Sequence, residues 1–106
     1  MRWLRHYRDE EDVTQFFEID DEGWVVRQVE LRGARQVPTV AGTRAELPDA
    51  NRDGLAAVQA YEAKYGVLAE QPMSKWDADF RHADIEQAEL EAIWKMARAH
   101  LERPAP

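Results

Sequence analysis

The chain has 106 residues, of which 44% are hydrophobic and 33% charged, a composition typical of one globular domain and not of a disordered chain. It contains no cysteine, which excludes disulfide bonds, thiol catalysis and cysteine-ligated metals. The net charge of −7 disfavours nucleic acid as a partner, because surfaces that bind nucleic acid are usually basic.

The N-terminus and the hydropathy of the chain indicate a soluble cytoplasmic protein. Residues 1–8 are basic and contain no apolar run of the kind that a secretory signal needs. No stretch approaches a membrane span of about 20 apolar residues. We therefore expect no membrane partner.

An antiparallel β-meander is predicted over residues 1–41. Residues 2–8 have a period-two pattern that places both aromatic side chains, Trp3 and Tyr7, on one side, which predicts a strand. Residues 13–31 predict a hairpin that turns at Asp21–Gly23, and residues 35–40 predict a further strand. Pro38 lacks an N–H group, so this last strand is expected at an edge of the sheet.

The pairing of the hairpin strands depends on the turn between them. A three-residue turn with Gly23 in a left-handed conformation places Arg27 opposite Phe17 and makes one face largely apolar. We predict this register because antiparallel sheets usually bury one face. The predicted apolar face contains Val13, Gln15, Phe17, Ile19, Val25, Arg27, Val29 and Leu31.

Two main helices are predicted, over residues 49–66 and 84–102. Gly66 supplies the left-handed residue that ends the first helix, and Asp84 is predicted to cap the second. The predicted buried stripe of the first helix is Leu55, Val58, Glu62 and Tyr65. The predicted stripe of the second is Leu90, Ile93, Trp94, Ala97 and Leu101. Between the helices, the spacing of Met73, Trp76 and Phe80 predicts one or two helical turns beneath the core.

These elements predict a single α+β domain over residues 1–106, with a three- to four-stranded antiparallel meander packed against two main helices. No pattern in it is typical of catalysis or of metal binding. The three histidines lie in different predicted elements, and Ser74 is the one serine. We therefore expect no catalytic residue, no metal ligand and no cofactor.

The hairpin carries one candidate surface for a protein partner. Residues 9–22 hold eight acidic residues and no basic one. Aromatic side chains surrounded by charge are common in protein interfaces, although a helix or loop of the same domain covers such a strip equally often. The candidate partner-binding residues are Phe16, Glu18, Asp20, Asp21, Glu22 and Trp24.

Arg27 is the unusual charged residue of the predicted apolar face. A guanidinium group there needs an ionic partner, and Glu62 of the first helix is the candidate. A structural ion pair is the favoured interpretation. The alternative is a pocket in which Gln15, Arg27 and Glu62 bind an anionic or polar ligand.

Residues 18–30 read Glu-Ile-Asp-Asp-Glu-Gly-Trp-Val-Val-Arg-Gln-Val-Glu. This segment resembles the hallmark hairpin of a family of small bacterial domains of unknown function, in which an acidic turn precedes a Trp, an Arg and a Val-Glu pair. Residues 90–94 are similar to the closing helix of that family. The resemblance, which is interrupted between residues 36 and 70, implies a bacterial α+β domain without catalytic residues. Some such small acidic domains look similar to immunity proteins that block toxins.

We therefore expect a non-enzymatic interaction protein, of the immunity-type inhibitor or antitoxin class, whose acidic surface binds a basic protein. The alternative is a small-molecule-binding or accessory enzyme domain of a biosynthetic pathway, with its pocket near Arg27. A homodimer is compatible with either function.

Overall fold

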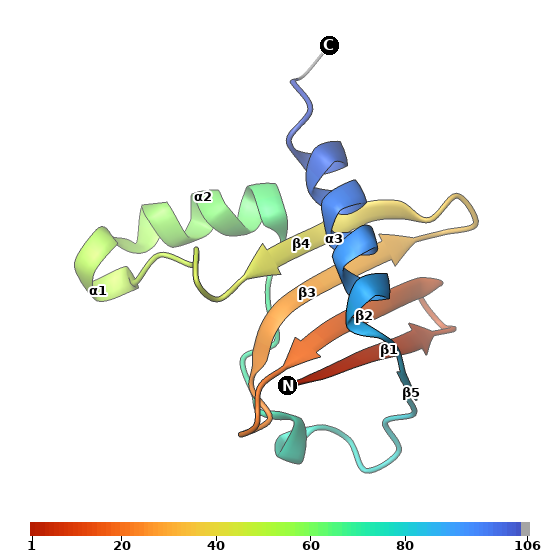
Figure 1. Cartoon of the computed structure of the whole chain (residues 1–106). Helices are drawn as coiled ribbons and strands as arrows, with labels where there is room; N and C mark the ends of the chain where they lie inside the picture. The colour runs from red at the N-terminus through yellow and green to blue at the C-terminus, as the bar shows by residue number, and fades with distance from the viewer. Residues whose placement is uncertain (105–106) are drawn as a thin grey trace.

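The structure is a computed structural model that describes residues 1–104, and a five-stranded antiparallel sheet forms its centre (Figure 1). The strand order is β4-β3-β2-β1-β5, so four strands form the predicted meander and β5 pairs with the outer edge of β1. Helices pack against this sheet, which confirms the predicted α+β class. The strands are β1 (Arg2–Arg8), β2 (Val13–Ile19), β3 (Val25–Arg32), β4 (Val37–Thr43) and β5 (Ala83–Asp84).

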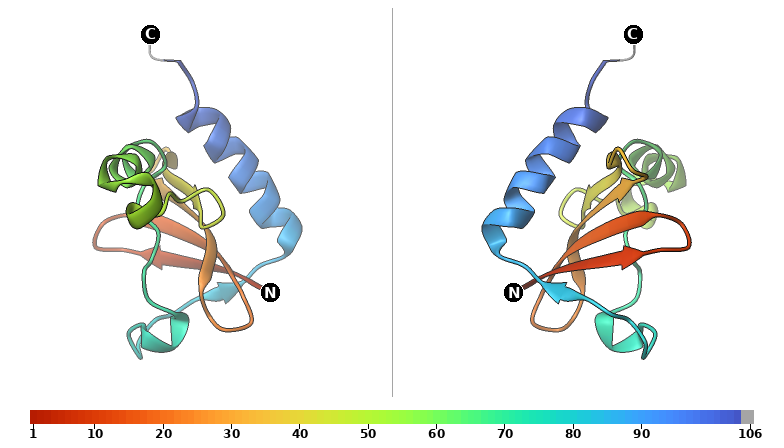
Figure 2. Two further views of the ribbon diagram at one scale, coloured as in Figure 1. Left: turned by 90° about the vertical axis from the view of Figure 1, so that its left-hand side faces the viewer. Right: turned by 90° about the vertical axis from the view of Figure 1, so that its right-hand side faces the viewer.

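The helical elements cover the sheet on both faces. Helix α3 lies on one face, and residues 66–82 cross the other, as the two side views in Figure 2 show. The elements are α1 (Ala50–Asp53), α2 (Leu55–Tyr65), the 3₁₀ turn η1 (Met73–Lys75) and α3 (Gln87–Leu101). The buried core on the α3 face comprises Phe16, Val29, Leu31, Ala41, Leu90 and Ala97. The buried core on the opposite face comprises Leu4, Phe17, Ile19, Val25 and Leu68, with Met73, Trp76 and Phe80 packed against it.

The predicted register of the hairpin is wrong beyond its first pair. Gly23 has the expected positive φ of 90°, and Ile19 lies opposite Val25. Val26 is then the extra residue of a β-bulge, so Arg27 lies opposite Glu18 and not opposite Phe17. The prediction assumed one solvated face. Because both faces of the hairpin are covered, an apolar pattern on one side does not determine the register.

The predicted first helix is two helices with one non-helical residue, Gly54, between them. Gly54 has φ of 90° and ψ of 154°, which ends α1 and precedes α2. Figure 1 shows both helices projecting beyond the edge of the sheet. The predicted buried stripe is wrong, because α2 buries none of its residues and Leu55 is 63% exposed.

The second predicted helix begins three residues later than expected. Asp84 belongs to β5, where its backbone pairs with Leu4, and the N–H of Ile85 donates to the carbonyl of Trp3. This pairing keeps the chain extended as far as Glu86, which is the N-cap residue of α3. The predicted apolar stripe of this helix does pack on the sheet.

Strand β4, which contains Pro38, lies at an edge of the sheet, as predicted. Side chains from α2 and α3 form hydrogen bonds with its backbone. The hydroxyl of Tyr61 accepts a hydrogen bond from the backbone N–H of Thr43 at 2.9 Å. Arg98 Nε donates to the carbonyl of Ala41 at 2.7 Å. Unpaired strand edges promote edge-to-edge association between molecules, so these contacts reduce the tendency of β4 to pair with another molecule.

Replacing Tyr61 with phenylalanine is expected to lower the free energy of unfolding by about 1.5 kcal/mol, because the N–H of Thr43 then lacks its acceptor. Urea unfolding measures the change, and amide hydrogen exchange at Thr43 should become faster. Tyr65→Phe is the control, since its hydroxyl bonds the exposed side chain of Glu102. Equal effects of the two substitutions would contradict this role.

Candidate functional site

Arg27 forms a structural ion pair on the α3 face. Its Nε donates to Glu18 Oε1 at 2.8 Å and its Nη2 donates to Oε2 at 3.0 Å. Nη1 donates to Glu91 of α3 at 3.2 Å, and Trp3 Nε1 donates to Glu18 at 2.9 Å. The hydrogen bonds from Arg27, followed by that from Trp3, hold the pKa of Glu18 below its usual value although burial raises it.

The three predicted pocket residues do not share a cavity. Arg27 faces α3, whereas Gln15 lines a cavity on the opposite face of the sheet. Glu62 lies on α2 beside a different hollow, with Arg44 and Leu68. Glu62 is therefore not the ionic partner of Arg27, whose partners are Glu18 and Glu91.

The proposed aromatic strip of the hairpin is covered by the domain itself. Phe16 belongs to the core beneath α3. Glu18 is 7% exposed and bonds Arg27. Trp24 is half-buried, and the guanidinium of Arg44 lies 5.2 Å from its ring centroid.

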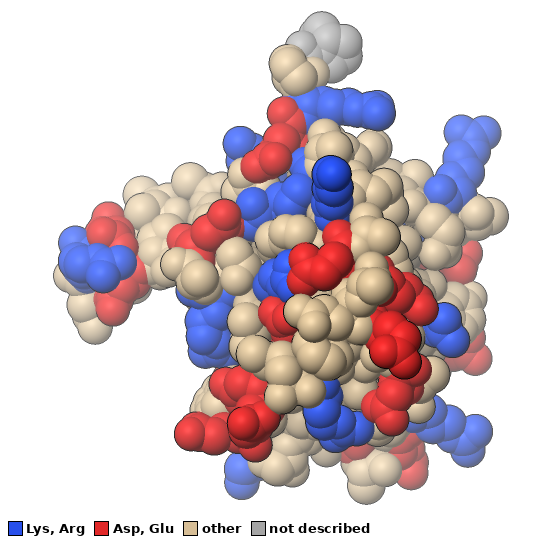
Figure 3. All heavy atoms as spheres, in the orientation of Figure 1, with Lys and Arg blue, Asp and Glu red and all other residues tan. Residues whose placement is uncertain are grey.

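The acidic turn of the hairpin remains at the surface (Figure 3). Asp20 stabilises the turn, because its Oδ1 accepts hydrogen bonds from the N–H groups of Glu22 and Trp24 at 2.9 Å each. Asp21 pairs with the N-terminal ammonium at 2.8 Å. Glu22 is exposed and is the member of this group that remains fully available to a partner.

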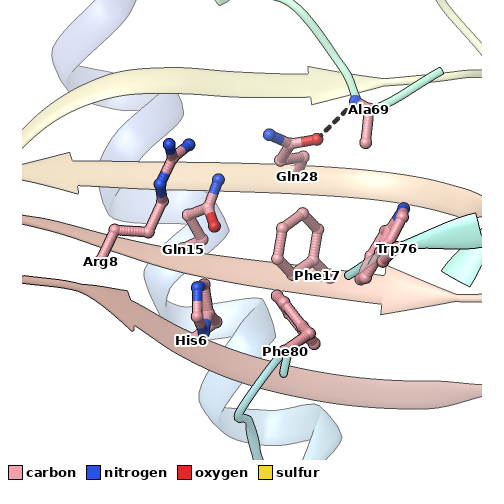
Figure 4. Close-up of a pocket in the computed structure, with 8 residues that line it drawn as sticks. All are labelled: His6, Arg8, Gln15, Phe17, Gln28, Ala69, Trp76 and Phe80. Carbon is pink, nitrogen blue, oxygen red and sulfur yellow. Dashed lines mark hydrogen bonds between the residues drawn. The ribbon is translucent and has the colours of Figure 1, made fainter. Parts of the chain in front are cut away.

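The main candidate site is a cavity of about 220 Å³ on the face opposite α3, which we call the aromatic cavity (Figure 4). Strands β1, β2 and β3 form its floor, and residues 69–80 form one wall. The ring centroids of Phe17 and Trp76 are 5.1 Å apart, and those of Trp76 and Phe80 are 4.9 Å apart. The lining residues are His6, Arg8, Gln15, Phe17, Gln28, Ala69, Trp76 and Phe80.

Two glutamine amides on the floor of the aromatic cavity are fixed in orientation. Gln28 Oε1 accepts from the backbone N–H of Ala69 at 2.8 Å, and its Nε2 donates to Glu30 at 2.7 Å. Gln15 Nε2 donates to the same oxygen of Glu30 at 3.0 Å. Because the carboxylate selects the amide nitrogen, the oxygen of Gln15 is left on the other side, toward His6 in Figure 4.

The second candidate hollow adjoins the first and is acidic. It has a volume of about 420 Å³, and we call it the acidic cavity. His6 and Arg8 line both cavities, so the two cavities adjoin, and we call them together the groove. With His6 neutral, five carboxylates and one guanidinium give the lining a formal charge of −4. The lining residues are His6, Tyr7, Arg8, Asp9, Glu10, Glu11, Asp77 and Asp79.

Sequence reasoning found only part of this groove. It singled out Gln15 as a polar residue on an apolar face, and it placed Trp76 and Phe80 beneath the core. It missed His6 and Arg8, although their spacing of two and four residues from Leu4 places all three on one face of the strand. Pairing of β1 with β2 places His6 directly opposite Gln15.

The groove contains no constellation of metal ligands. Over residues 1–104, no group of three or more histidine, aspartate or glutamate side chains is placed to hold a metal ion. In the same range, no helix has the length and apolar character needed to cross a membrane. No known protein family, curated protein or solved structure matches the chain. The resemblance to a family of small bacterial domains therefore stays a prediction.

Proposed function

We propose that the protein is a non-enzymatic binding protein that recognises a basic polypeptide through the groove formed by the aromatic and acidic cavities. The observation that carries this proposal is that the two cavities adjoin, with His6 and Arg8 in the lining of both. Aromatic side chains beside a lining of charge −4 suit a chain that carries apolar and cationic side chains close together.

The charge of the groove supports a cationic partner even though Arg8 lies within it. Arg8 is itself paired, because its Nε lies 2.6 Å and its Nη2 2.8 Å from the carboxylate of Glu11. The other acidic groups of the groove remain available, since Asp77 and Asp79 have exposed side chains and form no ion pair within residues 1–104. An immunity-type inhibitor or antitoxin that blocks a basic protein is the class of function that we propose.

A blocked basic peptide, acetyl-Lys-Leu-Arg-Leu-Lys-amide, is expected to bind the groove and to shift the backbone amide signals of β1 and of residues 77–80 in NMR titrations. The double substitution Asp77→Asn and Asp79→Asn is expected to weaken this binding about fivefold, because it removes two partly solvated ionic contacts. Binding should also weaken at high salt.

The matched control neutralises two acidic residues outside the groove, Asp21→Asn with Glu22→Gln. It changes the net charge equally, so it separates a local site from a general charge effect. Loss of binding in the control alone would assign the partner to the hairpin turn. An acidic peptide that binds as tightly as the basic one would contradict the proposal.

The second candidate is a small-molecule-binding protein that uses the aromatic cavity in place of the predicted pocket at Arg27. The volume of about 220 Å³ and the three aromatic rings favour it. Indole, which is planar and uncharged, serves as the probe in the same NMR titration. Binding of indole without binding of the basic peptide would favour this alternative.

A further inference from the structure

We infer that the aromatic cavity is a binding site for the guanidinium group of an arginine side chain of the basic partner. This inference rests on the proposed function and adds the identity of the side chain that enters the cavity. It follows from the polar atoms that the cavity leaves without partners, from the shape of its aromatic walls and from the charge beside it.

The first of these atoms is the amide oxygen of Gln15. The residue is only 8% exposed, and its nitrogen is held by Glu30 at 3.0 Å. Among residues 1–104, no donor bonds its oxygen, and that oxygen is not sealed from solvent. This oxygen is an acceptor that the domain does not use, and a donor that enters the cavity can bond it.

The second atom is Nε2 of His6. A backbone carbonyl can only accept a hydrogen bond, so the contact between Nδ1 of His6 and the carbonyl of Arg81 places the proton on Nδ1. In the neutral ring, Nε2 is then an acceptor. The atoms that Gln15 and His6 leave unpartnered are therefore both acceptors, which suits a ligand with several donors.

The aromatic walls favour a planar cation. Phe17 and Trp76 are tilted by 48° to each other, and Trp76 and Phe80 meet edge to face at 65°. A guanidinium group stacks on an aromatic face while its in-plane N–H groups remain free to donate, whereas a lysine ammonium is compact and more strongly hydrated. The walls and the acceptors together therefore select arginine over lysine.

The acidic cavity supplies the long-range attraction for this cation. It shares His6 and Arg8 with the aromatic cavity, and the guanidinium of Arg8 is already paired with Glu11. Neighbouring basic residues of the partner are expected to lie over Asp77 and Asp79. We therefore expect the groove to bind a basic segment that contains arginine more tightly than an equally basic segment without it.

The experiment compares three blocked peptides on the full chain by NMR titration. They are acetyl-Lys-Leu-Arg-Leu-Lys-amide and its two relatives in which the central arginine is lysine or citrulline, the neutral isostere of arginine. The arginine peptide is expected to bind about tenfold more tightly than either relative, because only arginine provides both the stacking cation and the planar donors. Gln15→Leu is expected to abolish the preference for arginine over lysine, and Gln59→Leu on exposed α2 is the matched control.

Equal affinities of the arginine and lysine peptides for the wild type would overturn the inference, as would a preference that survives in Gln15→Leu. If the two peptides bind equally but both bind more weakly to the Asp77 and Asp79 variant, the proposed function stands and the arginine-binding site does not. If none of the peptides binds, both fail. Circular dichroism checks that Gln15→Leu is folded, and the citrulline comparison on the wild type decides the question if it is not.

Discussion

Gly66→Ala is expected to lower the free energy of unfolding by about 4 kcal/mol. Gly66 has φ of 87° and ψ of 178°, a conformation that costs a residue with a Cβ atom about 2 kcal/mol. A Cβ atom at this position would also lie 2.5 Å from Cγ2 and 2.9 Å from Cβ of Val40. Val40 lies in the edge strand, so relief requires movement of the sheet or of the chain after α2, at about 2 kcal/mol more.

Gly54→Ala is the matched control for this prediction. Gly54 has a similar backbone conformation, with φ of 90° and ψ of 154°, but its Cβ atom would meet nothing within 4 Å. We therefore expect Gly54→Ala to cost about 2 kcal/mol, the conformational part alone. In a Val40→Ala background, the cost of Gly66→Ala should fall toward the same value. Urea unfolding that gives equal losses at positions 54 and 66 would refute the contact with Val40.

Arg27→Met is expected to destabilise the protein by about 3 kcal/mol at pH 7. The substitution leaves the carboxylate of Glu18 buried, with the indole N–H of Trp3 as its remaining donor. Breaking a buried ion pair from one side is costly, because the other charge stays desolvated. Glu91→Gln removes the outer carboxylate, whose side chain is 48% exposed, and should cost less than about 1 kcal/mol.

The loss caused by Arg27→Met should shrink in acid. In the wild type the pKa of Glu18 is lowered on folding, so its contribution is fully present above the usual glutamate pKa of about 4.3 and is lost as the pH falls through the folded-state value. The variant lacks the guanidinium that lowers this pKa. Urea unfolding at pH 7 and pH 3 measures both differences, and a loss that is constant with pH would rule out Glu18 as the group responsible.

The meander could be predicted from sequence because its signals are local. Period-two alternation and the glycine turn at Gly23 depend on neighbouring residues, and so does the stripe of α3. The bulge at Val26 and the two-residue strand β5 could not be predicted in this way. Both depend on segments that arrive later in the chain, α3 on one face and residues 66–85 around the other face and the β1 edge.

The candidate site was predicted less well than the fold for the same reason. The charged pair at Arg27 was expected from its position in a strand, but its partners depend on the register of β3 and on α3. Gln15 was noticed as a polar residue among apolar ones. Its role in the aromatic cavity became visible only once His6 lay opposite it and Trp76 lay above the sheet.

The two-sided covering of the sheet has a consequence for synthesis of the chain. When residues 1–43 have left the ribosome, the nascent chain contains all four strands of the meander. The segments that cover its two faces, residues 66–82 and α3, have not yet been synthesised. Residues 66–82 close one face next, and α3 closes the other after them. Until α3 has been synthesised, the nascent meander exposes the side chains of Phe16 and Val29, so the incomplete chain is a natural client for chaperones.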